Sequence, residues 1–206
     1  MRAVETDAVL LERWRTGCRE AGSVLIERYF AVLHRFFRSK VNGESGDLVQ
    51  QTFLACMEAR NRYDGQSSFK AYVLGIARNQ LFTHYGRQRR HPLAAEASSV
   101  RDLATSPSGA LARHQDEQLL SDALRRVPLE AQLVLELTFW EGLDGNELAR
   151  VLDVPLNTAY SRLRRAKSAL RAVLATLSPD RVQLEQLLER ACSLNDVPVA
   201  ALAHDR

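Results

Sequence analysis

The chain has 206 residues, of which 46% are hydrophobic and 26% are charged, and its formal net charge is +3. This length provides enough apolar sequence for one large domain or two small ones, and we favour two. The three cysteines are far apart and form no CxxC pair. That spacing argues against a disulfide framework or a zinc site, and it predicts a reduced, cytosolic setting.

No apolar run approaches the roughly 20 residues that a membrane helix needs. The first residues mix charged and apolar side chains, unlike the core of a signal peptide. We therefore expect a cytoplasmic protein without membrane insertion. The distribution of charge says more: residues 65–95 and 154–179 contain no Asp or Glu, whereas residues 114–153 are rich in both. Two basic patches around an acidic body are typical of a protein that touches a polyanion at two places.

Helical periodicity predicts four helices in the first half of the chain. The first covers residues 7–15, and the second runs from about 23 to 40. The third begins at Leu48 with Asp47 as its N-cap and ends near 60. The fourth covers residues 69–90 and follows a polar loop. An aromatic-rich stripe on the second helix is predicted to lie in the core: Ile26, Tyr29, Phe30, Leu33, Phe36 and Phe37.

The third predicted helix has an inner face and a polar outer face. The inner face holds Leu48, Thr52, Cys56 and Ala59. On spacing alone, an outer face of amides, carboxylates and one leucine is more often solvated, although another protein could dock on it. This outer face comprises Asp47, Gln50, Gln51, Leu54 and Glu58.

The fourth predicted helix mixes aromatic and basic side chains. Rings stack on unpaired bases, worth about 1–3 kcal/mol each, while Arg follows the backbone, so the mixture suits single-stranded nucleic acid. Considered singly, Tyr72 and Phe82 are better explained as core aromatics. The basic and amide surface comprises Lys70, Arg78, Asn79, His84, Arg87, Arg89 and Arg90.

Residues 92–108 are dominated by Ala, Ser, Thr and Pro, which predicts a linker. Helix is expected to resume near Ala110 and again at Pro128. Residues 180–192 form one more amphipathic pattern, whose apolar face must pack on the second domain or on another molecule. We predict an all-α fold with two helical domains joined by a flexible linker, the second containing a helix-turn-helix, plus a C-terminal extension helix. The expected boundaries are 1–91, linker 92–112, 113–177 and 178–206.

Residues 144–171 predict two short helices that cross at a tight turn. In the first, Leu148, Val151 and Leu152 recur at helical spacing. Pro155 suits the start of the second, because its backbone angle is helical and an N–H there would be unpaired anyway. The apolar face of the second helix is predicted to comprise Ala159, Leu163, Ala166, Leu170, Val173 and Leu177.

The opposite face of that second helix is basic and has no acidic residue. Solvated basic faces usually interleave Glu or Asp, so this pattern favours DNA binding. In a major groove, Arg and Lys contact phosphates or pair with guanine, and Asn, Ser and Thr reach other base edges. The face comprises Asn157, Thr158, Tyr160, Ser161, Arg162, Arg164, Arg165, Lys167 and Arg171.

Three segments together resemble a known family. They are DLVQQTFLACMEA from Asp47, FKAYVLGIARNQLFTHYGRQRR from Phe69, and VPLEAQLVLELTFWEGLDGNELARVLDVPLNTAYSRLRRAKSAL from Val127. In this order, with a linker before the third, they resemble the characteristic segments of the extracytoplasmic-function sigma factors, small two-domain members of the bacterial sigma-70 family. The resemblance covers roughly residues 21–174.

The resemblance implies a non-enzymatic initiation factor, without cofactor or metal, that binds core RNA polymerase and directs it to promoter DNA. The polymerase surfaces would be the clamp helices of the largest subunit and the flap region, and many members also bind an anti-sigma factor. Four side chains would meet the clamp helices: Asp47, Gln50, Gln51 and Leu54. The -10 element would be opened, and a flipped base held, by Tyr63, Phe69, Tyr72, Arg78, Asn79, Thr83, His84 and Arg87. The -35 element would be read by Thr158, Tyr160, Ser161, Arg162, Arg164, Arg165 and Lys167.

Four positions depart from the family's pattern. Tyr72 stands where Trp is most frequent, and Thr83 where Asp is common. Asn157 and Asp153 stand where Gly is frequent. Asp can adopt the left-handed backbone that such a turn needs, at some cost, so we expect the fold to be kept.

Other interpretations stay open. A plain helix-turn-helix regulator would bind duplex DNA without polymerase, but it leaves residues 47–90 unexplained. A sigma-like adaptor would bind polymerase without promoter-specific initiation. An enzyme finds little support, because there is no metal-ligand spacing or nucleophile motif. The histidines are scattered: His34, His84, His91, His114 and His204.

Overall fold

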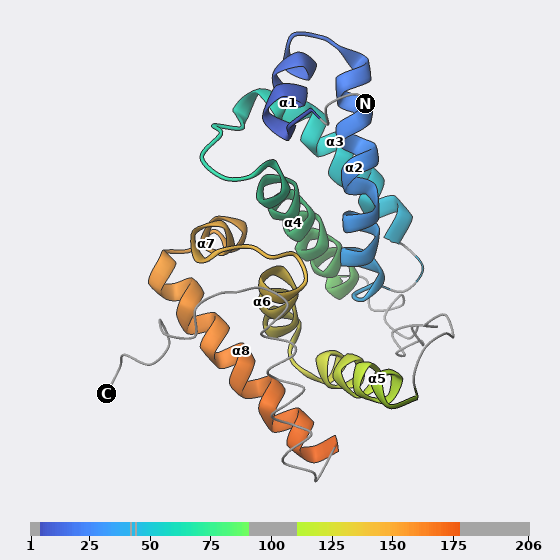
Figure 1. Cartoon of the computed structure of the whole chain (residues 1–206), viewed down its shortest axis with the longest axis vertical. Coiled ribbons are helices and arrows are strands. Elements are labelled where there is room, and N and C mark those ends of the chain that lie inside the picture. The colour runs from blue at the N-terminus through green and yellow to red at the C-terminus, as the bar shows by residue number, and fades with distance from the viewer. Residues whose placement is uncertain (1–4, 42, 44, 91–110, 178–206) are drawn as a thin grey trace. The chain divides into compact units, whose positions relative to one another are not determined.

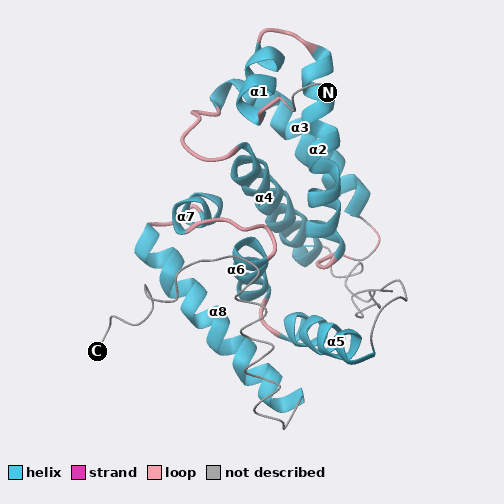
Figure 2. Ribbon diagram, viewed as in Figure 1, coloured by secondary structure: helices cyan, strands magenta, loops and turns pink. Residues whose placement is uncertain are grey.

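The computed structural model describes residues 5–41, 43, 45–90 and 111–177. In this part of the chain the regular elements are all helices, joined by turns and loops, and there is no strand (Figure 2). The all-α prediction is therefore confirmed there. The predicted C-terminal helix, residues 180–192, and nearly all of the predicted linker lie outside the described residues.

The helices fall into two compact units (Figure 1). The second unit includes α7 (Gly145–Leu152) as far as Ala149. The first unit contains α1 (Asp7–Arg15), α2 (Arg19–Arg38), α3 (Ser45–Ala59), the 3-10 helix η1 (Arg60–Arg62) and α4 (Phe69–Arg90). The remaining helices of the second unit are α5 (Leu111–Arg126), α6 (Leu129–Phe139) and α8 (Leu156–Leu177).

In the first unit, α1 packs on α2, α2 on α3, and α3 on α4. The crossing of α1 and α2 is close because Gly22 has no side chain: a Cβ there would lie 2.5 Å from Nε1 of Trp14. Most of the predicted aromatic stripe on α2 is buried, but Phe30 is 52% exposed, so its place in the core was wrongly predicted. Helical periodicity alone does not show where a stripe ends, since packing partners decide that.

One helix in this unit has the predicted bounds, and another does not. α4 begins and ends as predicted, and Ser68 caps it by accepting a hydrogen bond from Ala71 N at 3.1 Å. α3 begins at Ser45, so Asp47 lies in its first turn and not at the N-cap. An acid is favourable at both places, because both lie at the positive end of the helix dipole, and the sequence alone does not separate them.

The second unit is built around α6, whose residues from Gln132 to Phe139 are all buried except the partly buried Glu136. α8 packs on both α6 and α5. Its buried stripe begins as predicted with Ala159, Leu163, Ala166 and Leu170, but continues to Leu174. Val173 and Leu177, predicted for this face, are only partly buried. At this end α8 contacts its partner helices along the side that carries Leu174.

Candidate nucleic-acid and protein interfaces

The outer face of α3 carries the four side chains predicted to bind polymerase. Asp47, Gln50, Gln51 and Leu54 are all exposed, while Leu48 and Cys56 on the opposite side are buried. Leu54 is 51% exposed, and Met57, three residues further along the same face, is 40% exposed. The sequence analysis missed Met57, although its spacing from Leu54 places the two side by side on a helix. Two neighbouring exposed apolar side chains within a polar rim are typical of a protein-binding surface.

Three residues predicted for the -10 element form one aromatic cluster. The ring centroid of Tyr63 lies 4.9 Å from that of Tyr72 and 6.0 Å from that of Phe69. Phe69 is only 4% exposed and packs edge-on against Tyr29, with centroids 5.5 Å apart. Phe69 therefore supports the cluster from below, whereas Tyr63 and Tyr72 are partly exposed.

The Tyr72 hydroxyl donates to the Ala59 carbonyl at 2.9 Å, which holds its ring against the end of α3. Burial raises the pKa of this phenol above its ordinary value, so the ring stays neutral over the physiological range. Tyr63 is held by the loop itself, because its hydroxyl donates to the Ser67 carbonyl. The cluster thus presents two fixed, uncharged rings.

The polar residues of α4 divide into two groups. Asn79, Thr83 and Arg87 are exposed and recur every four residues, so they form one outward row. The guanidinium of Arg78 stacks on the Phe82 ring, 4.9 Å from its centroid, and His84 lies edge-on to Tyr85. Arg78 and His84 thus contact aromatic rings of their own helix.

The helix-turn-helix begins with a reciprocal cap on α7. One carboxylate oxygen of Asp144 accepts hydrogen bonds from the backbone N–H groups of Asn146 and Glu147, at 2.8 and 2.9 Å. The Glu147 carboxylate accepts in turn from Asp144 N at 3.3 Å. This arrangement is a capping box, in which two side chains satisfy the free donors at a helix start. It determines where α7 begins.

The turn after α7 has the left-handed residue that the sequence analysis anticipated. Asp153 has φ of +53°, and its N–H donates to the Arg150 carbonyl at 3.1 Å. The next N–H, that of Val154, donates to the Ala149 carbonyl at 3.0 Å. This pair of bonds is a Schellman motif, which usually has Gly at the left-handed position. α8 then begins at Leu156, one residue later than predicted, and the Pro155 carbonyl just before it accepts hydrogen bonds from the N–H groups of Thr158 and Ala159.

Tyr160, a predicted -35 contact, leans over the start of α7. A Cβ on Gly145 would lie 2.3 Å from the Tyr160 hydroxyl oxygen, so the ring occupies the space that this glycine leaves. The side chain remains 39% exposed. The sequence analysis did not identify Gly145, because nothing in the pattern distinguishes a packing glycine from a turn glycine.

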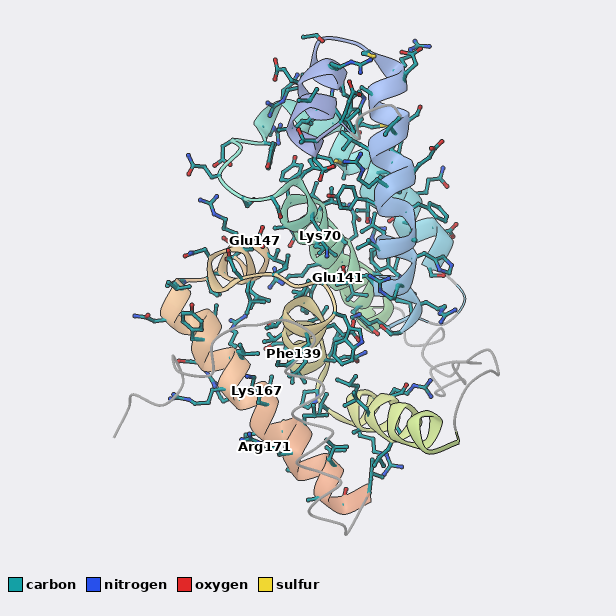
Figure 3. All side chains as sticks on the ribbon, viewed as in Figure 1. Lys70, Phe139, Glu141, Glu147, Lys167 and Arg171 are labelled. Carbon is teal, nitrogen blue, oxygen red and sulfur yellow. The ribbon has the colours of Figure 1, made fainter. Side chains whose placement is uncertain are left out.

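The basic face of α8 is partly solvent-facing. Arg164 and Arg165 are exposed, and Thr158, Ser161 and Arg162 are partly exposed. Lys167 differs, because its Nζ lies over the Phe139 ring, 5.1 Å from the centroid (Figure 3). Its DNA contact stays a prediction, but the structure gives it a packing partner on α6.

Among the described residues, no helix is long and apolar enough to cross a membrane. Nor does this part of the chain contain a group of three or more His, Cys, Asp or Glu side chains arranged to hold a metal ion. Cys18 and Cys56 are free thiols, and burial raises the pKa of the Cys56 thiol to about 12.

Comparison with known protein families gives two matches. Residues 25–91 match sigma-70 region 2, and residues 117–170 match sigma-70 region 4. The first range includes α4 and all of α3, and the second includes the helix-turn-helix. Together the two ranges span more than half of the chain.

Relatives and solved structures agree with these matches. The chain is 28% identical over 176 residues to the ECF RNA polymerase sigma-E factors of Salmonella typhimurium and Escherichia coli, covering 80% of this chain and 92% of each relative. The sigma-E factor of Haemophilus influenzae is 27% identical over 177 residues, with 80% and 93% covered.

Two solved structures share the fold. CnrH, solved with the cytosolic domain of CnrY, has a TM-score of 0.63 and 23% identity, with 84% of this chain and 100% of that chain covered. The sigma factor RpoE of Bartonella quintana, solved with the anti-sigma factor NepR, has a TM-score of 0.58 and 22% identity, with 73% and 92% covered. With both sigma-70 regions present in order, the chain belongs to the extracytoplasmic-function sigma factors of the sigma-70 family and is a transcription initiation factor.

Proposed function

We propose that this chain binds core RNA polymerase through the outer face of α3, holds the unpaired -10 strand on the Tyr63–Tyr72 cluster and α4, and reads the -35 duplex with α8. The observation that carries the proposal is that the two units present different nucleic-acid chemistry. The first presents two partly exposed neutral rings beside a row of amide, hydroxyl and Arg side chains, and the second presents a basic helix face.

The polymerase surface is supported by the exposure of Leu54 and Met57 between polar neighbours. Burying two such apolar side chains supplies affinity, while Asp47, Gln50 and Gln51 supply directional hydrogen bonds at the rim. The partner proposed for this face is the pair of clamp helices in the largest polymerase subunit, with a second contact at the flap region. An anti-sigma factor is a further proposed partner, as in the solved complex of the structural relative RpoE with NepR.

Opening the -10 element costs a few kcal/mol for each unstacked base step. Stacking a free base on an aromatic ring returns about 1–3 kcal/mol, so Tyr63 and Tyr72 together are of the right size to offset that cost. In this proposal the exposed side chains of Asn79 and Thr83 offer amide and hydroxyl groups to base edges, and the exposed Arg87 contacts a phosphate. No chemical step by this chain is required, because capture of the open strand is enough.

The basic face of α8 suits a duplex groove. Arg164 and Arg165 are exposed and free of acidic neighbours on α8, so they are available for phosphates or for guanine. Because both DNA-binding units are on one chain, binding at one element makes the other intramolecular, which raises overall affinity. In this proposal the polymerase performs catalysis, and the factor acts in the cytoplasm without a cofactor of its own.

The proposal is tested by run-off transcription from a promoter library with purified core polymerase. The test variant is the double substitution Asp47→Ala with Gln51→Ala, and the matched control is Glu27→Ala on the exposed side of α2. We expect specific starts from the wild type and the control, and a strong reduction in the folded double variant.

Two other outcomes identify the alternatives. Stable polymerase binding without specific starts would favour a sigma-like adaptor. Duplex binding without any polymerase binding would favour a plain helix-turn-helix regulator.

A further inference from the structure

The loop between η1 and α4, residues 63–68, contains short-range bonds of its own. Asp64 accepts a hydrogen bond from Gln66 N at 2.9 Å, Gly65 has φ of +74°, and the Tyr63 hydroxyl reaches the Ser67 carbonyl. Local turns of this kind are weak unless a neighbouring element holds them. The loop carries Tyr63, one of the two rings proposed to hold the open strand, so what fixes it matters for function.

Arg15, the last residue of α1, holds this loop from outside it. Its Nε donates to the Arg60 carbonyl at 3.0 Å, and its Nη2 donates to the Tyr63 carbonyl. The same guanidinium lies over the Tyr63 ring, with Cζ 5.7 Å from the centroid. One planar group therefore contacts the backbone at Arg60, the first residue of η1, and at Tyr63, the residue just after η1. It also contacts the Tyr63 ring. A lysine ammonium is a single point charge and cannot reproduce this fork.

α1 itself is firmly anchored, which makes Arg15 a fixed support. Trp14 fills the space over Gly22 of α2. At the other end of α1, Asp7 accepts hydrogen bonds from Arg28 and from the Tyr29 hydroxyl. Tyr29 packs on Phe69, the buried base of the aromatic cluster. Both ends of α1 are thus connected to the cluster, although α1 lies before the range that matches sigma-70 region 2.

We propose that Arg15 is a positioning residue for promoter opening: it holds the backbone and ring of Tyr63 in the orientation that receives an unpaired base. The inference rests on the proposed function of the Tyr63–Tyr72 cluster. Because the Arg15 donors are used inside the protein, Arg15 acts by preorganising the loop and not by neutralising a phosphate. Its loss therefore weakens single-strand binding without changing how that binding depends on salt.

The test compares Arg15→Lys with Arg13→Lys in holoenzyme assembled with core polymerase. Both substitutions keep the charge, but the described contacts of Arg13 are with Glu5 and Cys18, away from the loop. The measurement is affinity for a single-stranded -10 oligonucleotide across a salt series, beside affinity for core polymerase and for a -35 duplex.

We expect Arg15→Lys to weaken single-strand binding about tenfold, the equivalent of losing one or two hydrogen bonds. The salt slope, polymerase affinity and -35 binding should stay at wild-type values, and Arg13→Lys should match the wild type throughout. If Arg15→Lys does not fold, Arg15→Gln, which keeps an amide donor, takes its place with the same expectations.

A double-mutant cycle with Tyr63→Ala identifies the route of the effect. If Arg15 acts through the Tyr63 ring, Arg15→Lys adds little in the Tyr63→Ala background. Full additivity, or unchanged single-strand binding by folded Arg15→Lys, would overturn the inference while leaving the proposed function intact. A wild-type holoenzyme that showed no preference for the single strand would overturn the proposed function, and the inference with it.

Discussion

Lys167 of α8 and Phe139 of α6 are paired across the helix interface, with the ammonium 5.1 Å from the ring centroid. Phe139 is buried, and Lys167 covers one face of its ring. A cation over an aromatic ring contributes about 0.5–1 kcal/mol at an exposed site and more when desolvated. The pair therefore links α8, the helix proposed to face DNA, to the core of its unit.

The first prediction separates packing from DNA contact on α8. Lys167→Ala should lower the free energy of unfolding by about 1 kcal/mol, with little change in the salt slope of -35 binding. Arg164→Ala should leave stability within about 0.5 kcal/mol and reduce that slope by about 1. Chemical unfolding and a salt titration of duplex binding measure the two effects. The reverse pattern would show that Lys167 acts mainly as a phosphate contact, as the resemblance implies.

The second prediction concerns the capping box of α7. Asp144→Ala removes the acceptor for two backbone donors, which should cost about 1 kcal/mol of stability and weaken -35 binding, because α7 supports α8 through the contact of Gly145 with Tyr160. Asp144→Asn keeps an acceptor oxygen and should lose much less. Equal losses in the two variants would mean that the carboxylate charge matters more than the cap.

The third prediction uses two helical glycines with opposite surroundings. Gly22→Ala places a methyl group 2.5 Å from Trp14 Nε1 and should destabilise the chain by about 1–3 kcal/mol despite the better helix propensity of Ala. Gly86 has nothing within 4 Å of a new Cβ, so Gly86→Ala should stabilise α4 by about 0.5–1 kcal/mol. Urea unfolding of both variants checks this. Stabilisation by Gly22→Ala would show that the α1–α2 crossing adapts easily.

The fourth prediction concerns alkaline pH. Burial raises the pKa of the Cys56 thiol from 9.0 to about 12, so the folded chain keeps the thiol neutral while the unfolded chain ionises it. Unfolding then releases a proton, and stability falls as the pH rises through this window, by up to about 1.4 kcal/mol per pH unit.

The variant that isolates this effect is Cys56→Ala. Unfolding free energies measured at about pH 7, 9 and 10.5 should fall less steeply for the variant than for the wild type above pH 9. Tyr29 and Tyr85 also have raised pKa values and contribute equally to both proteins. Part of the raised pKa of Tyr72 comes from Cys56 itself, so the variant loses that part together with the thiol. Identical pH dependence in the two proteins would mean that the Cys56 thiol does not titrate differently on folding.

The sequence by itself determined the helices, their order and most of their inner faces, because the 3.6-residue period and the cap and turn residues act locally. The limits of α1 and α4 followed from such local signals, whereas the left-handed residue Asp153 was anticipated from the family resemblance. The sequence also identified most of the side chains of α3 that the structure leaves exposed, though not Met57, since polarity and spacing are properties of a single helix.

Only the tertiary structure decided which neighbours each side chain has. Phe30 lies outside the core and Phe69 inside it, and the Lys167 ammonium lies over the Phe139 ring. The tertiary structure also brought Arg15 of α1 to the Tyr63 loop, more than forty residues away in sequence. These relationships depend on how the helices cross. The close approaches at Gly22 and Gly145 each depend on the space around one residue. A single glycine adds nothing to the helical period, so the sequence pattern does not show them.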